Sequence, residues 1–241
     1  MRPTRETSST AATIEQKTKI LRITLAATVL SFIIFLITLT SSHWVFVTYP
    51  PPDFFSIRQN MFVDRSRYGI IWECLNGRPN GSSVFEYKCD FHPSHVPNTS
   101  LPAEQTLIGM TRTMLSFSII HILLVIITFI CGLYSIRDYR YTYKRLTGMI
   151  YILSAAALVV CIEVLSTIFR HSTEHLSYIY PTGTKCTYGV CYIIAWIIFI
   201  QLLGSSFIFF ACSKKRKGTF DEATEEEALA NRPVDLGRSF R

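Results

Sequence analysis

The chain has 241 residues, of which 49% are hydrophobic and only 17% are charged. A typical water-soluble domain carries about 25% charged residues, so this composition argues against a globular protein that folds in water. The net charge of +7 is not arranged along the chain as a basic stripe interleaved with aromatic residues. The sequence therefore predicts a membrane protein, and it predicts no nucleic-acid partner.

Four apolar stretches are long enough to cross a lipid bilayer. A spanning helix needs about 20 mostly apolar residues, because the hydrocarbon core is about 30 Å thick. The predicted spans are Ile23–Thr40, Met114–Ile136, Leu146–Phe169 and Val190–Cys212. Each stretch is apolar around its whole circumference, as expected of a helix that faces lipid. We therefore expect an all-α membrane protein built on a four-transmembrane-helix bundle within residues 20–212.

Basic residues near the ends of the spans predict the orientation of the chain. Lysine and arginine close to a span resist translocation, so they mark the cytosolic side. They cluster before the first span, in the inner loop at 137–145, and after the fourth span: Lys17, Lys19, Arg22, Arg137, Arg140, Lys144, Arg145, Lys214, Lys215, Arg216 and Lys217. We expect a multi-pass plasma-membrane protein whose N-terminal tail (1–19) and C-terminal tail (213–241) are cytosolic, and we expect residues 1–16 to be polar and disordered. The basic residues would also attract anionic membrane lipids.

This topology places the first outer loop, residues 43–112, outside the cell, where disulfides persist. The loop contains Cys74 and Cys89, which we expect to be paired. Alternating apolar residues around them predict two strands, at 70–75 and 83–89, and the turn-rich segment 76–81 would join these strands. A disulfide between neighbouring strands suits that geometry.

Two N-glycan acceptor triplets lie on the same loop, at Asn80-Gly81-Ser82 and Asn98-Thr99-Ser100. One triplet alone says little, but two on the loop that the charge pattern places outside support each other. We expect a glycoprotein with sugars on Asn80 and Asn98.

The third predicted span contains an acid, Glu163. A carboxylate within a span is costly and usually has a partner. Two interpretations remain open: an interhelical hydrogen bond to a serine or threonine, or a contact with the charge of a partner protein, such as a voltage-sensing arginine. The neighbouring small residues 154–157 offer a surface for close helix approach, within the bundle or against a partner.

The second outer loop, residues 170–189, contains two patterns that we considered as sites. The segment 171–175 matches the H-x-x-E-H pattern of some zinc proteases, but the loop is too short to supply a folded cleft. We interpret it as a solvated helix end, and we expect no catalytic, cofactor or metal site. Cys186 on this loop and Cys191 at the mouth of the fourth span either form a second disulfide or remain free.

These residues resemble the claudin, peripheral myelin protein and calcium-channel gamma-subunit superfamily. Its signature is a tryptophan, then Gly-Leu-Trp-x-x-Cys, then a second cysteine, and the chain offers Trp44, then Gly69-Ile70-Ile71-Trp72-Glu73-Cys74, then Cys89. The second tryptophan is displaced by one position. Arg112 stands where the family has an arginine opening the second span. The resemblance implies a small extracellular antiparallel β-sheet, formed mainly by the first outer loop.

Within that superfamily, the chain is most similar to the skeletal-muscle-type gamma subunits of voltage-gated calcium channels. The similar segments are residues 19–25, Arg137-Asp138-Tyr139 and residues 161–165. The resemblance implies a non-catalytic accessory subunit that packs its second and third helices against a voltage sensor in the pore-forming subunit of a voltage-gated cation channel.

The alternative is a claudin-like protein of cell junctions that binds claudin-like proteins in cis or in trans and forms or regulates a paracellular barrier. Two observations favour the interpretation as a channel subunit. Glycans on the first outer loop would sit awkwardly in a tight cell contact, and the last residues, 237–241, end in a charge that does not fit the apolar pocket of a PDZ domain. A structural adhesion or myelin-type protein shares the same architecture and is not separable by sequence.

Overall fold

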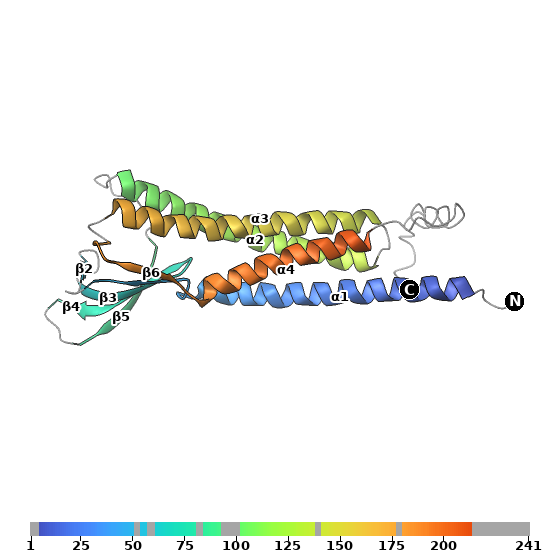
Figure 1. Cartoon of the computed structure of the whole chain (residues 1–241), viewed down its shortest axis with the longest axis horizontal. Helices are drawn as coiled ribbons and strands as arrows, with labels where there is room; N and C mark the ends of the chain where they lie inside the picture. The colour runs from blue at the N-terminus through green and yellow to red at the C-terminus, as the bar shows by residue number, and fades with distance from the viewer. Residues whose placement is uncertain are drawn as a thin grey trace, which may run out of the picture.

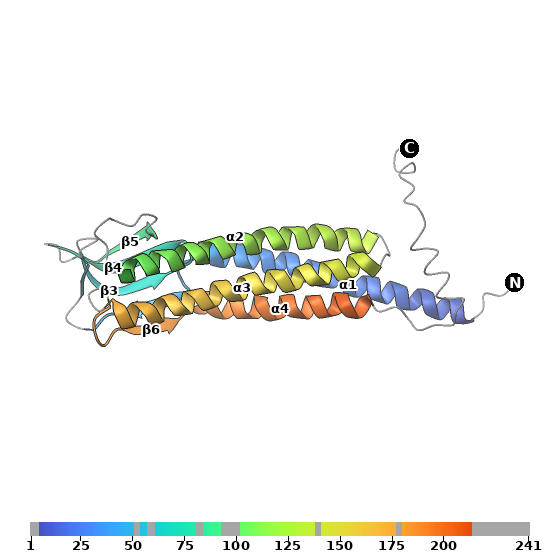
Figure 2. The same ribbon diagram turned by 90° about the horizontal axis from the view of Figure 1, so that it is seen from above.

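The structure is a computed structural model that describes residues 5–50, 54–56, 61–80, 84–92, 102–137, 141–176 and 180–213. Four helices run side by side as a bundle, and a β-sheet lies at one end of it (Figure 1). The second view shows α2 and α3 reaching past the bundle to lie along the sheet (Figure 2). The molecule is therefore an elongated rod with a helical shaft and a β-structured head.

The four helices are α1 (Arg5–Thr40), α2 (Pro102–Arg137), α3 (Tyr141–His175) and α4 (Val190–Cys212). All four are long and apolar enough to cross a membrane, which confirms the prediction of four spanning helices. Crossing the hydrocarbon core takes about 20 residues. The 36 residues of α2 and the 35 of α3 therefore leave several turns outside the bilayer, and these turns support the sheet.

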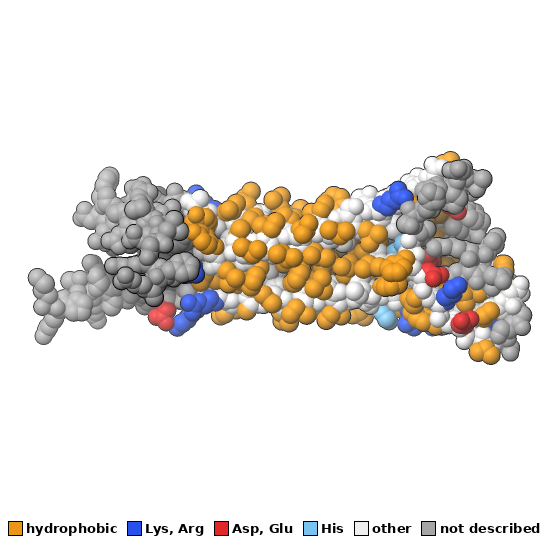
Figure 3. Space-filling view, turned by 180° about the vertical axis from the view of Figure 1, so that it is seen from behind, with side chains coloured by type: hydrophobic (Ala, Val, Ile, Leu, Met, Phe, Trp, Pro, Cys, Tyr) orange, Lys and Arg blue, Asp and Glu red, His pale blue; other side chains and the backbone are white. Residues whose placement is uncertain are grey.

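An apolar belt covers the face of the shaft seen in Figure 3, and charged side chains gather beyond it at both ends. Exposed isoleucine and leucine side chains make up much of this belt on all four helices, for example Ile33, Ile130, Leu153 and Ile200. Such a surface is unfavourable in water and favourable in hydrocarbon. The belt marks the depth at which the shaft crosses the membrane.

The helices extend further than the apolar stretches predict. Helix α1 begins at Arg5, so the expectation of a disordered N-terminal tail is wrong for most of that segment. Lys19 and Glu15, four residues apart, form a 2.8 Å ion pair that supports this polar turn of the helix. Likewise, α2 begins at Pro102, within the predicted first outer loop. Hydropathy cannot detect these turns because their side chains are polar.

The described strands form one antiparallel six-stranded sheet, as the resemblance predicted. Its members are β1 (Val45–Thr48), β2 (Phe54–Ser56), β3 (Met61–Tyr68), β4 (Trp72–Pro79), β5 (Glu86–Phe91) and β6 (Lys185–Tyr188). The order across the sheet is β5-β4-β3-β1-β6, and β2 pairs with the outer part of β3. The first outer loop supplies all strands except β6, which comes from the second outer loop.

The predicted turn at 76–81 is wrong for residues 76–79, because β4 continues through Asn76 to Pro79. The turn preference of Asn76-Gly77 is overridden by pairing with strands on both sides. A side chain at Gly77 would overlap the carbonyl oxygen of Phe62 on β3, so glycine here permits close strand approach. A glycine is common in turns, but Gly77 lies in a strand where there is no room for a side chain.

The sheet buries one face against the helices. Val45, Val47, Met61 and Val63 lie on this face and are at most 2% exposed. They belong to a core that continues into the helical bundle through Leu158, Ile162 and Leu165 of α3. The head and the shaft therefore share one hydrophobic core.

A substitution of Gly69, in the turn between β3 and β4, tests this packing. An added Cβ would overlap the carbonyl oxygen of Ser41 and lie 3.1 Å from the Cα of Ser42, and backbone atoms cannot rotate away. We expect Gly69→Ala to destabilise the protein by about 1–3 kcal/mol. The measurement is the melting temperature of detergent-solubilised protein, read from the folded fraction after heating.

Gly204→Ala is the matched control, because a Cβ at Gly204 on α4 meets no atom within 4 Å. This variant should keep or raise the melting temperature, since alanine is the better helix former. Equal losses for the two variants would contradict the packing argument.

Candidate functional site

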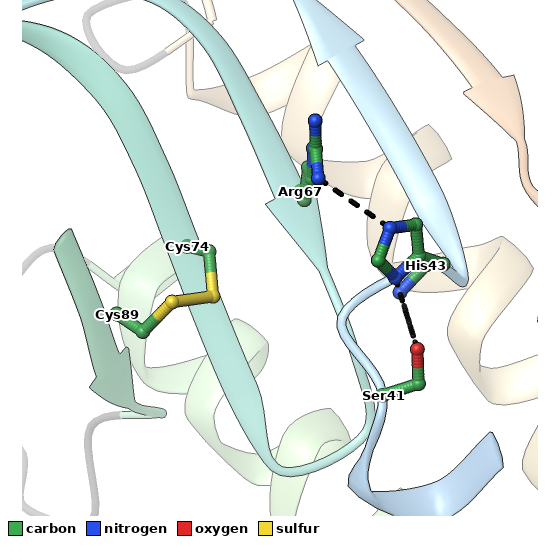
Figure 4. Close-up of a disulfide and its surroundings, with 5 residues drawn as sticks. All are labelled: Ser41, His43, Arg67, Cys74 and Cys89. Atoms are coloured by element: carbon green, nitrogen blue, oxygen red, sulfur yellow. Dashed lines mark hydrogen bonds between the residues drawn. A yellow bond between two sulfur atoms is a disulfide. The ribbon is translucent and has the colours of Figure 1, made fainter. Parts of the chain in front are cut away.

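The disulfide between Cys74 and Cys89 fixes the outermost strand of the sheet (Figure 4). The two residues are direct partners in the register of β4 and β5. Their bond closes a loop that contains the first glycan acceptor, Asn80, which lies exposed just after β4. The second acceptor, Asn98, lies outside the described residues.

The second pair of cysteines is not bridged. Cys186 on β6 and Cys191 in the first turn of α4 are both free thiols. Burial raises the pKa of the Cys186 thiol, so its reactive thiolate form is disfavoured. The sequence left open either a disulfide or two free thiols, and the structure contains two free thiols.

Two of the signature residues, Trp44 and Gly69, lie where the shaft joins the head, whereas Arg112 and Trp72 do not. Trp44 is fully buried, and its indole Nε1 donates a 2.6 Å hydrogen bond to the carbonyl oxygen of Thr38, in the last turn of α1. The backbone N–H of Gly69 donates to the carbonyl oxygen of Trp72 at 2.8 Å and closes the tight turn between β3 and β4. Arg112 lies on an exposed face of the outer part of α2.

The displaced tryptophan of the signature faces outward. A shift of one residue along a strand moves a side chain to the opposite face of the sheet. Trp72 therefore lies on the same face as Cys74, where its ring stacks on Phe91 with centroids 3.9 Å apart. Ile71, at the position where the signature has its tryptophan, is partly buried, and Ile70 before it is fully buried.

A hydrogen-bonded chain of tyrosines ties the two outer loops together. The hydroxyl of Tyr180, from the second loop, donates to the hydroxyl of Tyr68 on β3 at 2.6 Å. Tyr68 in turn donates to Oε1 of Glu73 on β4, also at 2.6 Å. The ring of Tyr68 meets the edge of Phe169 on α3, so this cluster joins sheet, loop and helix.

Burial raises the pKa of both Tyr68 and Tyr180 well above 10, and the nearby Glu73 carboxylate raises each further. Both hydroxyls stay protonated at neutral pH and remain hydrogen-bond donors. The protonated hydroxyls stabilise the folded state through their hydrogen bonds. Because the folded-state pKa of each tyrosine is raised, this contribution to stability is complete below about pH 10 and is lost as the pH rises further.

Tyr68→Phe tests this chain. The variant removes the acceptor for Tyr180 and one donor to Glu73, while the ring and its contacts remain. We expect a loss of about 1–3 kcal/mol, because a buried polar group loses its hydrogen-bond partner. Thermal unfolding in detergent measures the loss, and Tyr87→Phe, at an exposed tyrosine of the same sheet, is the control. Indistinguishable melting temperatures for the two variants would refute a stabilising role for this hydrogen-bonded chain of tyrosines.

Sequence reasoning missed His121, which lies in the middle of the second predicted span. The side chain is 1% exposed, and its Nδ1 donates to the carbonyl oxygen of Ser154 on α3 at 2.9 Å. Its ring meets the edge of Phe35 on α1, with centroids 4.6 Å apart. The histidine thus joins three helices by polar and aromatic contacts. The available signal was the presence of an ionisable residue within a span.

The small residues 154–157 and Glu163 of the third span do not all lie on one face of α3. Ser154, Ala155 and Ala157 are at most 5% exposed, so they serve close packing within the bundle. Ala156 and Glu163 lie on the exposed face of α3. The Glu163 carboxylate has no hydrogen-bond or ion partner among the described residues, so the structure does not contain the interhelical bond to a serine or threonine that was one of the two open interpretations.

The fold and these contacts define a class: a membrane protein with four spanning helices and a disulfide-bonded outer sheet anchored by a buried tryptophan. The family model described as PMP-22/EMP/MP20/Claudin tight junction matches residues 29–212, and the chain belongs to this family. No match was found among the curated proteins. The finer resemblance to calcium-channel gamma subunits therefore belongs to the proposal that follows.

Proposed function

We propose that the chain is a non-catalytic auxiliary subunit that binds the pore-forming subunit of a voltage-gated calcium channel and modulates its gating. The observation that carries the proposal is the exposed carboxylate of Glu163 on the lipid-facing side of α3. The sequence resemblance to gamma-type subunits supports the same assignment.

Glu163 lies six residues before the end of the predicted third span, which corresponds to a depth of about 9 Å. A charged carboxylate facing hydrocarbon is costly, and such residues usually pair with another charge or mark a functional site. Since the carboxylate has no partner among the described residues of its own chain, a cation on a neighbouring membrane protein is the natural complement. An arginine of a voltage sensor has this chemistry at this depth.

The surface around Glu163 suits a helix partner. Leu153, Ala156, Val160, Glu163 and Thr167 recur at three- and four-residue spacing, so they form one stripe along α3. Ala156 is small enough to let a second helix approach closely. A partner that fits this stripe better in one sensor position than in another shifts the gating equilibrium by that difference in affinity.

Glu163→Gln tests this contact, because it keeps the shape of the side chain and removes its charge. We expect co-purification with the pore-forming subunit to weaken at least about tenfold, since breaking a buried ion pair costs about 3–5 kcal/mol. The shift that co-expression causes in the steady-state inactivation curve should disappear as well.

Glu174→Gln provides the matched control, because Glu174 is an exposed acid on the same helix beyond the predicted span. It should leave both measurements unchanged. Normal binding and gating by the Glu163 variant would remove the main support for the proposed contact.

The proposal includes an orientation with the sheet outside the cell and both tails in the cytosol. The basic flanks of the spans support it. In this orientation Asn80 and Asn98 meet the glycosylation machinery, whereas the inverted orientation would hide them in the cytosol.

We expect enzymatic removal of N-glycans to increase the gel mobility of the wild-type protein. Asn80→Gln and Asn98→Gln should each remove one step of this shift, and the double variant should show none. Asn76→Gln is the control, because Asn76 is not part of an acceptor triplet. A wild-type protein whose mobility does not change would contradict the orientation.

The alternative function is a claudin-like junction protein that forms or regulates a paracellular barrier with claudin-like proteins in cis or in trans. The description of the matching family names tight junctions and supports this reading. Enrichment at cell contacts together with self-association, and without a channel subunit in the purified complex, would favour it over the channel assignment.

A further inference from the structure

The outward face of the sheet collects positive charge from three separate strands. Its cations are Arg65 and Arg67 on β3, Arg78 on β4 and Lys185 on β6. Strand register places them together, because Lys185 pairs with Thr48, which in turn pairs with Arg65. Arg65 and Lys185 are exposed, and the side chain of Arg65 is 70% exposed. We call this surface the outer cationic face; its members are Phe46, Arg65, Arg67, Arg78, Phe85, Tyr87 and Lys185.

Aromatic rings alternate with these cations. The guanidinium of Arg67 lies 5.9 Å from the ring centre of Phe46 and 5.7 Å from that of Tyr87. Arg78 lies 5.1 Å from the ring centre of Phe85. Phe85 and Tyr87 are more than half exposed, so their faces are accessible beside the cations.

His43 helps to hold Arg67 in place (Figure 4). Arg67 Nη1 lies 3.4 Å from Nε2 of His43, whose Nδ1 lies 3.0 Å from Oγ of Ser41. A guanidinium only donates hydrogen bonds, so Nε2 is the acceptor. Arg67 is thus positioned before any ligand arrives, which reduces the entropy lost on binding.

The carboxylates of the sheet lie on the opposite face. The same face carries the buried Leu75 and the acids Glu73, Glu86 and Asp90. Glu73 lies two residues from Leu75 and pairs with Asp90, and Glu86 pairs with Gly77, two residues further along β4. Among the described strand residues, only Asp64 at the β-bulge brings a carboxylate near the outer cationic face, 3.6 Å from Arg65. The outward face is therefore positive although the sheet as a whole carries both signs.

We propose that the outer cationic face binds a polyanionic glycan, a sugar chain bearing sulfate and carboxylate groups. Guanidinium groups donate paired, charge-assisted hydrogen bonds to such planar or tetrahedral oxyanions. Exposed aromatic rings stack against the C–H faces of sugar rings. Adjacent strands are about 4.8 Å apart. The cations lie on three strands, so they are spread over a surface that an extended chain of charged sugars can follow.

The arrangement fits a glycan better than it fits an acidic protein. Protein interfaces have an apolar centre from which charges are depleted, surrounded by a polar rim. On the outer cationic face, each of Phe46, Tyr87 and Phe85 instead has a guanidinium over its ring. The rings of the outer cationic face are therefore paired with charges, whereas Trp72 and Phe91 stack on each other further along the same side of the sheet.

The test uses intact cells that express the full chain and are treated with heparinase to remove their own glycans. Fluorescent heparin is the probe, and surface biotinylation gives the amount of protein at the surface. Intact cells exclude the cytosolic basic residues of the proposed topology from the measurement. We expect binding near 0.15 M salt that is lost near 1 M, where the Debye length falls from about 8 Å to about 3 Å.

Arg65→Ala/Lys185→Ala should weaken heparin binding about three- to tenfold, because two exposed cations are removed. The matched control is Lys88→Ala/Arg170→Ala, which removes the same charge from residues outside this face. It should change binding by less than about twofold.

Three results would overturn the proposal: no heparin binding by the wild-type protein, equal losses for the two double variants, or equal binding of neutral dextran. Binding of poly-L-glutamate as tight as that of heparin would also overturn it and would point to an acidic protein partner. Heparin that binds only after permeabilisation would show that the face does not meet extracellular glycans.

Discussion

Trp44 is the point at which the helical shaft is fixed to the β-structured head. Its indole fills a fully buried site and donates to the last turn of α1, while its backbone N–H donates to Tyr68 at the end of β3. Its carbonyl oxygen accepts a 2.7 Å hydrogen bond from the N–H of Gly189, the residue before α4. One residue therefore sets the position of the first helix, the central strands and the fourth helix relative to one another.

Much of the architecture follows from the sequence, because the bilayer imposes a strong and simple constraint. Four apolar stretches predicted four spanning helices, and a topology that places one loop in an oxidising compartment predicted the pairing of Cys74 with Cys89. Both are seen in the structure. The helix ends were harder to predict, since the polar turns near Pro102 and before Ile23 depend on packing and on local ion pairs that hydropathy does not register.

The remaining errors arise from tertiary contacts that override local preference. Asn76-Gly77 has the composition of a turn, yet it lies within β4, because the backbone of β3 approaches too closely for a side chain. The role of His121 depends on Ser154 and Phe35, which belong to other helices. The outer cationic face also could not be predicted from the sequence. Its residues are distant in sequence, and only strand register brings them together.

The two proposed surfaces lie in different solvents and obey different electrostatics. Glu163 faces hydrocarbon, where a single charge is costly and requires a specific complement. The cations on the sheet face water, where each contact is weak and salt-sensitive and where recognition needs several of them. A contact through the membrane helices and a contact through the sheet can therefore be made independently by the same molecule.

The origin of β6 in the second outer loop has a consequence for biosynthesis. Strands β1 and β3–β5 and their disulfide belong to the first loop, so they can pair as soon as that loop has been made. Their neighbour β6 reaches β1 only after α3 has been inserted and the chain has been made almost to α4. Until then β1 has an unpaired backbone edge, and unpaired edges invite association with other chains. The sheet is therefore complete only after the first three helices have been made and β6 has followed them.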